Sequence, residues 1–150
     1  MAEALRLARK GLYTTDPNPR VGCVIADGAQ VSGRGWHQQA GGPHAEIAAL
    51  RDANHSVRGQ TAYVTLEPCS HHGRTPPCVG ALLEAGIARV VVAVPDPNPA
   101  VAGEGLGQLR ESGVDVQTGL MANEAEALNC GFLRRMRIGR PWVRVKSAIS

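Results

Sequence analysis

Five consecutive apolar residues, Val90 to Val94, constrain the fold more than any other feature of this chain. A strand that is apolar on both sides buries both faces, which is typical of a central strand in a parallel sheet. Other β-rich runs along the chain alternate with stretches whose apolar residues recur at helical spacing. This alternation predicts an α/β fold, in which helices cover both faces of one sheet.

The order of the expected elements makes the sheet mixed. Helices are expected over 2–12, 44–53, 76–85, 103–111 and 121–133. Strands are expected over 21–26, 30–36, 61–66, 88–94 and 114–117. The Asp27-Gly28 turn signal joins the first two strands as an antiparallel hairpin. Residues 142–146 are interpreted as a last strand or as the start of a truncated segment.

The distribution of charge along the chain limits the kinds of partner that it could bind. The chain has 150 residues, enough for one domain with a sizeable core. Residues 1–130 hold ten Lys and Arg against thirteen Asp and Glu, a net charge of −3, so the basic balance belongs to residues 131–150. A nucleic-acid binder usually carries basic charge on its binding face, so we expect no nucleic-acid partner and interpret the tail as a solvated segment. No leader or spanning segment is apparent, so we expect no membrane contact and a cytoplasmic location.

A reducing compartment favours cysteines as metal ligands or core residues over disulfides. His44, Cys69 and Cys78 provide imidazole and thiolates, the ligands that suit zinc. The segment with His44 and the segment with the two cysteines each lie where a loop enters an expected helix. Three protein ligands leave one tetrahedral position open, as in catalytic zinc sites. Glu46, two residues after His44, is the candidate for proton transfer. Positions two apart on a helix point to opposite sides, so His44 is expected in an irregular first turn.

His-x-Glu followed by Pro-Cys and a second Cys is the signature of zinc nucleobase deaminases. Here eight residues separate Cys69 from Cys78, where the usual motif has two. Three longer segments, at 17–23, 42–46 and 67–78, strongly resemble the deaminase domain of the bacterial riboflavin-biosynthesis deaminase–reductase. The resemblance covers essentially the whole chain, and the long insert between the cysteines is its most specific part.

That resemblance implies a fold, a reaction and a cofactor. The fold is the cytidine deaminase-like three-layer αβα sandwich, with a mixed, mostly parallel five-stranded sheet. The reaction is hydrolytic removal of the 2-amino group of 2,5-diamino-6-ribosylamino-4(3H)-pyrimidinone 5′-phosphate, in riboflavin biosynthesis. One Zn²⁺ per chain is implied, together with a small phosphorylated pyrimidine as ligand and a homo-oligomeric state.

The family's longer chains continue into an NADPH-dependent reductase that begins near a Lys-x-Ala-x-Ser stretch. Lys146, Ala148 and Ser150 match that stretch. We therefore expect a zinc-dependent deaminase domain over 1–145 and the start of a truncated reductase domain, or a linker, over 146–150. NADPH would belong only to the reductase, which this chain lacks.

The resemblance also suggests which side chains contact the substrate. Arg74, in the insert, is expected to hold the 5′-phosphate. The Asp-Pro-Asn-Pro sequence occurs at 16–19 and again at 96–99, each time beside an expected strand, as two rigid walls of one pocket. The expected substrate-binding residues are Asn18, His37, His71, Arg74, Asp96 and Asn98.

Two other interpretations stay open at this stage. The chain could be another zinc deaminase, acting on a free base, a nucleotide or adenosine in tRNA, although the tRNA type favours a basic, aromatic binding face. Alternatively, it could be a non-catalytic zinc module whose site is closed by His71 or His72. Four protein ligands would support the module, and three would support the enzyme.

Overall fold

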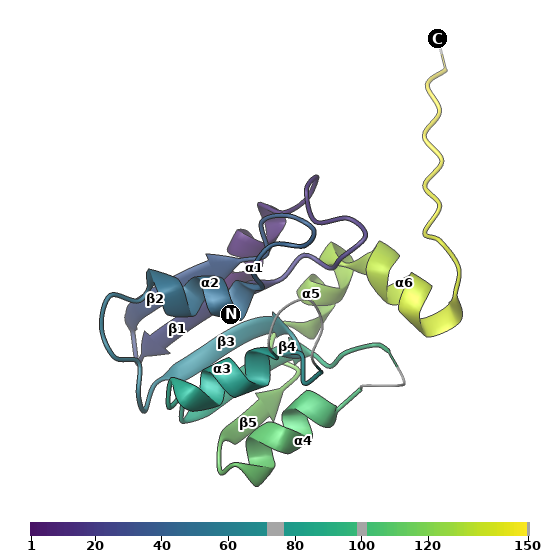
Figure 1. Cartoon of the computed structure of the whole chain (residues 1–150). Coiled ribbons are helices and arrows are strands. Elements are labelled where there is room, and N and C mark those ends of the chain that lie inside the picture. Colours follow the sequence, from purple (N-terminus) through teal and green to yellow (C-terminus); the bar gives the residue numbers. More distant parts are fainter. Residues whose placement is uncertain (72–76, 99–101, 150) are drawn as a thin grey trace.

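The computed structural model describes residues 1–71, 77–98 and 102–149, and its centre is one mixed five-stranded sheet (Figure 1). The strands are β1 (Gly22–Asp27), β2 (Gln30–Trp36), β3 (Thr61–Leu66), β4 (Arg89–Val94) and β5 (Asp115–Thr118). They lie in the order β2-β1-β3-β4-β5. Strand β1 is antiparallel to both of its neighbours, whereas β3, β4 and β5 are mutually parallel. Four strands therefore run in one direction, which confirms the mixed, mostly parallel sheet.

Helices cover both faces of the sheet, as predicted. One face carries α2 (Ala45–Asp52), α3 (Cys78–Glu84) and α4 (Glu104–Glu111), and the other carries α1 (Ala2–Arg9) and α5 (Ala122–Leu128) (Figure 1). The last helix, α6 (Cys130–Ile138), follows α5 almost directly. Among the described residues, no helix is both long and apolar enough to cross a membrane.

The apolar run in β4 is buried, and its side chains contribute to two core clusters. Val90 and Val92 belong to the core cluster under α2, α3 and α4. Ala93 and Val94 belong to a second cluster with residues of α1, α5 and α6. The prediction of a central strand with two buried faces is confirmed.

Two glycines of β2 bring α2 unusually close to the sheet. A Cβ atom on Gly33 would lie 2.3 Å from the carbonyl oxygen of Ala49, and one on Gly35 would lie 2.2 Å from that of Ala45. Any side chain at these two positions would push the helix away. The glycines therefore fix the height of α2, and with it the position of the residues at its N-terminus.

The structure corrects several predicted boundaries. The first helix ends at Arg9 rather than at residue 12. The predicted helix over 121–133 is two helices, because Asn129 leaves helical geometry and directs its side chain elsewhere. No strand forms over 142–146 in this described part of the chain, and the Val143 and Val145 side chains are exposed. No strand of the described sheet lies beside residues 142–146, so this segment has no backbone hydrogen-bonding partner that would make it a strand.

Candidate active site

The first turn of α2 presents two chemically active side chains. His44 is the N-cap residue and has extended backbone angles (φ −71°, ψ 162°), so it precedes the helix proper. Glu46 lies in the first helical turn and is buried. The change of backbone geometry between the two residues removes the opposition expected of positions two apart in a regular helix. His44 is expected in an irregular first turn, and the structure places it directly before that turn, as the N-cap.

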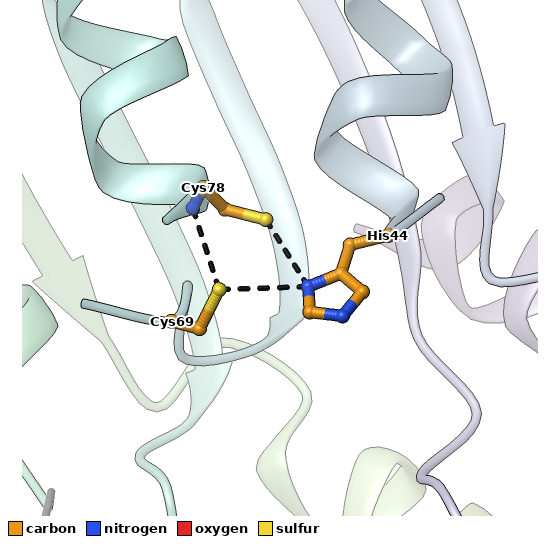
Figure 2. Close-up of side chains that lie close together, drawn as sticks. All are labelled: His44, Cys69 and Cys78. Atoms are coloured by element: carbon orange, nitrogen blue, oxygen red, sulfur yellow. Dashed lines mark hydrogen bonds between the residues drawn. The ribbon is translucent and has the colours of Figure 1, made fainter. Parts of the chain in front are cut away.

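Cys69 and Cys78 reach the same point from different elements. Cys69 lies in the loop after β3, and Cys78 is the first residue of α3 (Figure 2). The Cys78 backbone N–H donates to the Cys69 sulfur at 3.3 Å. The His44 Nδ1 atom lies 3.5 Å from the Cys69 sulfur and 3.3 Å from the Cys78 sulfur. The helix N-terminus thus draws one sulfur toward the other two ligand atoms.

This group fits a zinc ion. Zinc bonds of about 2.0–2.1 Å to nitrogen and 2.3 Å to sulfur, at tetrahedral angles, place such ligands about 3.6 Å apart. The three ligand atoms all lie within 4.8 Å of one another. Within the described residues, this group holds three candidate ligands and does not include His71; His72 lies outside the described part of the chain. The described residues therefore provide the three-ligand pattern of an open site.

The charges of the two thiols also favour a cation. Hydrogen bonds from Cys78, and then from His44, lower the pKa of Cys69 to about 4. The bond to Cys69 and burial raise the pKa of Cys78, because a second thiolate beside the first is unfavourable. The pKa of His44 is raised, mainly by its hydrogen bond to Cys69. A divalent cation between the sulfurs would allow both thiols to ionise.

Glu46 has the properties of a proton carrier. Its side chain is only 3% exposed, and burial raises its pKa to about 7. A carboxyl group with a pKa near the working pH can both accept and return a proton.

A pocket of about 260 Å³ lies against this group. It is lined by His44, Glu46 and Cys69 together with four of the predicted substrate-binding residues, Asn18, His37, His71 and Asp96. Burial raises the pKa of Asp96. Asn98 is not among the lining residues; its backbone N–H donates to Asp96 Oδ1 at 2.8 Å. Arg74 lies outside the described residues.

His37 connects two loops at the edge of the pocket. Its Nδ1 lies 3.0 Å from the Pro43 carbonyl oxygen, and its Nε2 lies 3.4 Å from the Asn18 Nδ2. Since a carbonyl only accepts, Nδ1 carries the proton and Nε2 accepts from the Asn18 amide. Asn18 therefore meets His37 through its amide nitrogen and not through its carbonyl oxygen.

Sequence reasoning missed several residues that line the pocket, among them Glu67 and Phe132. The buried Glu67 carboxylate accepts backbone hydrogen bonds from Asp96, Gly103, Gly105 and Leu106. It thereby ties the Cys69 loop to the N-terminus of α4. The available signal was an acidic residue placed directly after a strand, where helix N-termini converge. Phe132 of α6 provides an apolar wall of the pocket, and nothing in its local sequence indicates that role.

Known proteins are similar to this chain over its full length. The profile of the cytidine and deoxycytidylate deaminase zinc-binding region matches residues 1–94. The Escherichia coli riboflavin biosynthesis protein RibD is 59% identical over 150 residues, which is all of this chain and 41% of RibD. The diaminohydroxyphosphoribosylamino-pyrimidine deaminase of Buchnera aphidicola subsp. Schizaphis graminum is 48% identical, over 94% of this chain and 96% of that protein.

Solved structures agree with the sequence matches. A structure of Acinetobacter baumannii RibD superposes with a TM-score of 0.92 at 53% identity, and covers 94% of this chain and 40% of RibD. The chain thus spans about two fifths of the length of the RibD relatives.

Proposed function

The chain belongs to the cytidine and deoxycytidylate deaminase family, and we propose that it hydrolytically deaminates 2,5-diamino-6-ribosylamino-4(3H)-pyrimidinone 5′-phosphate. The products are the corresponding pyrimidinedione and ammonia, in a step of riboflavin biosynthesis. One observation carries the proposal. Glu46 and two members of the ligand group, His44 and Cys69, line one pocket of about 260 Å³.

The proposed ligands of the metal are His44, Cys69 and Cys78. When bound, zinc would lower the pKa of a water molecule and supply the nucleophile for attack on the amine-bearing carbon. Because two thiolates and a neutral imidazole cancel the charge of Zn²⁺, a nearby base is needed to take the proton of water. Glu46 is the buried carboxyl group in position for that task.

Glu46 then completes the proton balance of the reaction. It takes the two protons of water in turn and passes one to the ring nitrogen and one to the amine, which leaves as ammonia when the C–N bond breaks. One C–O bond forms, one C–N bond breaks, and the carboxyl group ends in its starting protonation state. Its pKa of about 7 suits both directions of transfer near neutral pH.

The remaining lining residues suit a polar aromatic ring. Asn18 offers an amide oxygen, His71 and Asp96 provide further polar groups, and Phe132 and Leu66 form apolar surface. We propose that these side chains, together with Asn98, hold the pyrimidine, and that Arg74 binds the 5′-phosphate. The relative named for this substrate, which the chain covers almost completely, supports the assignment.

The predicted cellular location and oligomeric state belong to the same proposal. We expect the enzyme to work in the cytoplasm as a homo-oligomer, on a small phosphorylated pyrimidine. Size-exclusion chromatography with light scattering measures the oligomeric state, and a single monomeric species would overturn that part.

Ammonia release from three compounds tests the substrate assignment. Zinc-loaded protein would be given the diaminopyrimidinone phosphate, dCMP and cytidine in parallel. We expect kcat/KM for the first compound to exceed the others by at least about 100-fold, because polar groups built for one substrate stay unpaired with another. Faster turnover of dCMP or cytidine, or no turnover of the first compound, would overturn the assignment.

A further inference from the structure

Asn129 forms a two-way pairing with the backbone of Arg20, which lies 109 residues earlier in the chain. The Arg20 backbone N–H donates to Asn129 Oδ1 at 2.9 Å, and Asn129 Nδ2 donates to the Arg20 carbonyl at 2.8 Å. Only one orientation of the amide satisfies both bonds. The Asn129 side chain is 5% exposed, so the pairing is shielded from water.

The helix that follows makes no use of the Asn129 side chain. Asn129 is the N-cap residue of α6, a position where Asn usually accepts a hydrogen bond from the first turn. Here the side chain makes no capping hydrogen bond. The amide is therefore committed to Arg20, and a local role in starting α6 does not explain it.

The Asn129 amide makes the two hydrogen bonds to Arg20 that a residue of a neighbouring antiparallel strand would make. The antiparallel ladder of β1 and β3 ends at Cys23 paired with Val64, and Arg20 lies beyond that end. Exchange of both hydrogen bonds with one residue is the pattern of an antiparallel strand pair. Asn129 thus extends the pairing of this segment where β3 no longer accompanies it.

The segment held in this way is a wall of the pocket. Asn18, Pro19 and Val21 flank Arg20, and all three line the pocket. Two further bonds tie it to the same helices: the Arg20 guanidinium donates to the Leu128 carbonyl, and Arg135 donates to the Pro17 carbonyl at 2.7 Å. On the other side, His37 contacts the Asn18 amide.

We propose that Asn129 is a positioning residue, which sets the place of Asn18 in the pocket by fixing the backbone of Arg20. The proposal rests on the proposed function, because it assigns Asn18 to substrate binding. Asn129 itself does not line the pocket; it acts through the segment 17–21. The junction of α5 and α6 therefore completes the site by holding this segment and by supplying Phe132.

The test compares Asn129→Ala with Asn123→Ala, a matched change at an exposed position of α5. We expect Asn129→Ala to raise KM for the diaminopyrimidinone phosphate by about tenfold, with kcat within about twofold, because Glu46 and the metal ligands are untouched. Asn123→Ala should keep both parameters. Asn129→Asp retains the size and the acceptor but loses the donor, and it serves as the second variant if Asn129→Ala folds poorly.

Hydrogen exchange gives a readout that does not depend on activity. Peptides covering residues 17–23 should exchange at least about tenfold faster in Asn129→Ala than in the parent protein, since the Arg20 amide loses its acceptor. Unchanged exchange, or faster exchange with an unchanged KM, would overturn the proposal. An inactive parent protein would instead refute the proposed function, and the exchange rates would still decide whether Asn129 holds the segment.

Discussion

The Glu67 carboxylate accepts a hydrogen bond of 3.0 Å from the backbone N–H of Gly105, in the first turn of α4. The approach is close, since a Cβ atom on Gly105 would lie 2.3 Å from the Pro68 carbonyl oxygen. Pro68 directly precedes the candidate ligand Cys69. The contact therefore connects the packing of α4 to the position of a metal ligand.

Replacement of Gly105 by Ala should destabilise the protein by about 1–3 kcal/mol, because the backbone of Pro68 must move. Gly107→Ala is the matched control on the same helix, since a Cβ atom there meets nothing within 4 Å. It should stabilise by about 0.5–1 kcal/mol through helix propensity. Urea unfolding measures both values, and equal effects of the two substitutions would contradict this account of the contact.

Loss of either thiol should remove the metal. In Cys69→Ala and Cys78→Ala, zinc affinity measured by chelator competition should fall by more than about 100-fold. Loss of a residue that only hydrogen-bonds to a metal ligand costs up to about 100-fold, and loss of the ligand itself should cost more. Cys130→Ala should bind zinc like the parent, because Cys130 is outside the ligand group. Parent-like affinity in either of the first two variants would refute the proposed ligand set.

His37→Ala should weaken catalysis without loss of zinc. The ring fixes the Asn18 amide and lines the pocket, and misplacement of a contact by about 1 Å can cost about 100-fold in rate. We expect kcat/KM to fall by about 10- to 100-fold at an unchanged zinc content. His55→Ala is the control, since His55 is exposed and contacts Asn54 and Ser32. Parent-like kcat/KM in His37→Ala would show that the ring is not needed.

Local patterns predicted much of this structure. The apolar run at 90–94, the hairpin around Asp27-Gly28 and the helical start near His44 each depend on neighbours in the chain, and all are confirmed. The comparisons also confirm the family resemblance that the motifs around His44, Cys69 and Cys78 indicated.

Long-range pairings could not be predicted in the same way. The Asn129 side chain pairs with the backbone of Arg20, 109 residues earlier, and Glu67 accepts hydrogen bonds from helix α4, more than 30 residues later. Asn is a poor helix former and a common cap residue, so Asn129 gave a local signal for a break, but its pairing with Arg20 is invisible to local periodicity. Phe132 reaches the pocket from α6, beyond that break.

We propose that Glu46 moves the protons of a zinc-dependent deamination. Glu46→Gln keeps the size of the side chain and removes its ability to carry a proton, and Glu84→Gln is an exposed control on α3. Ammonia release from the diaminopyrimidinone phosphate should be measured for zinc-loaded parent and both variants, at matched zinc content. We expect turnover by the parent and by Glu84→Gln, and a kcat at least about 100-fold lower in Glu46→Gln. A Glu46→Gln rate close to that of the parent would contradict it.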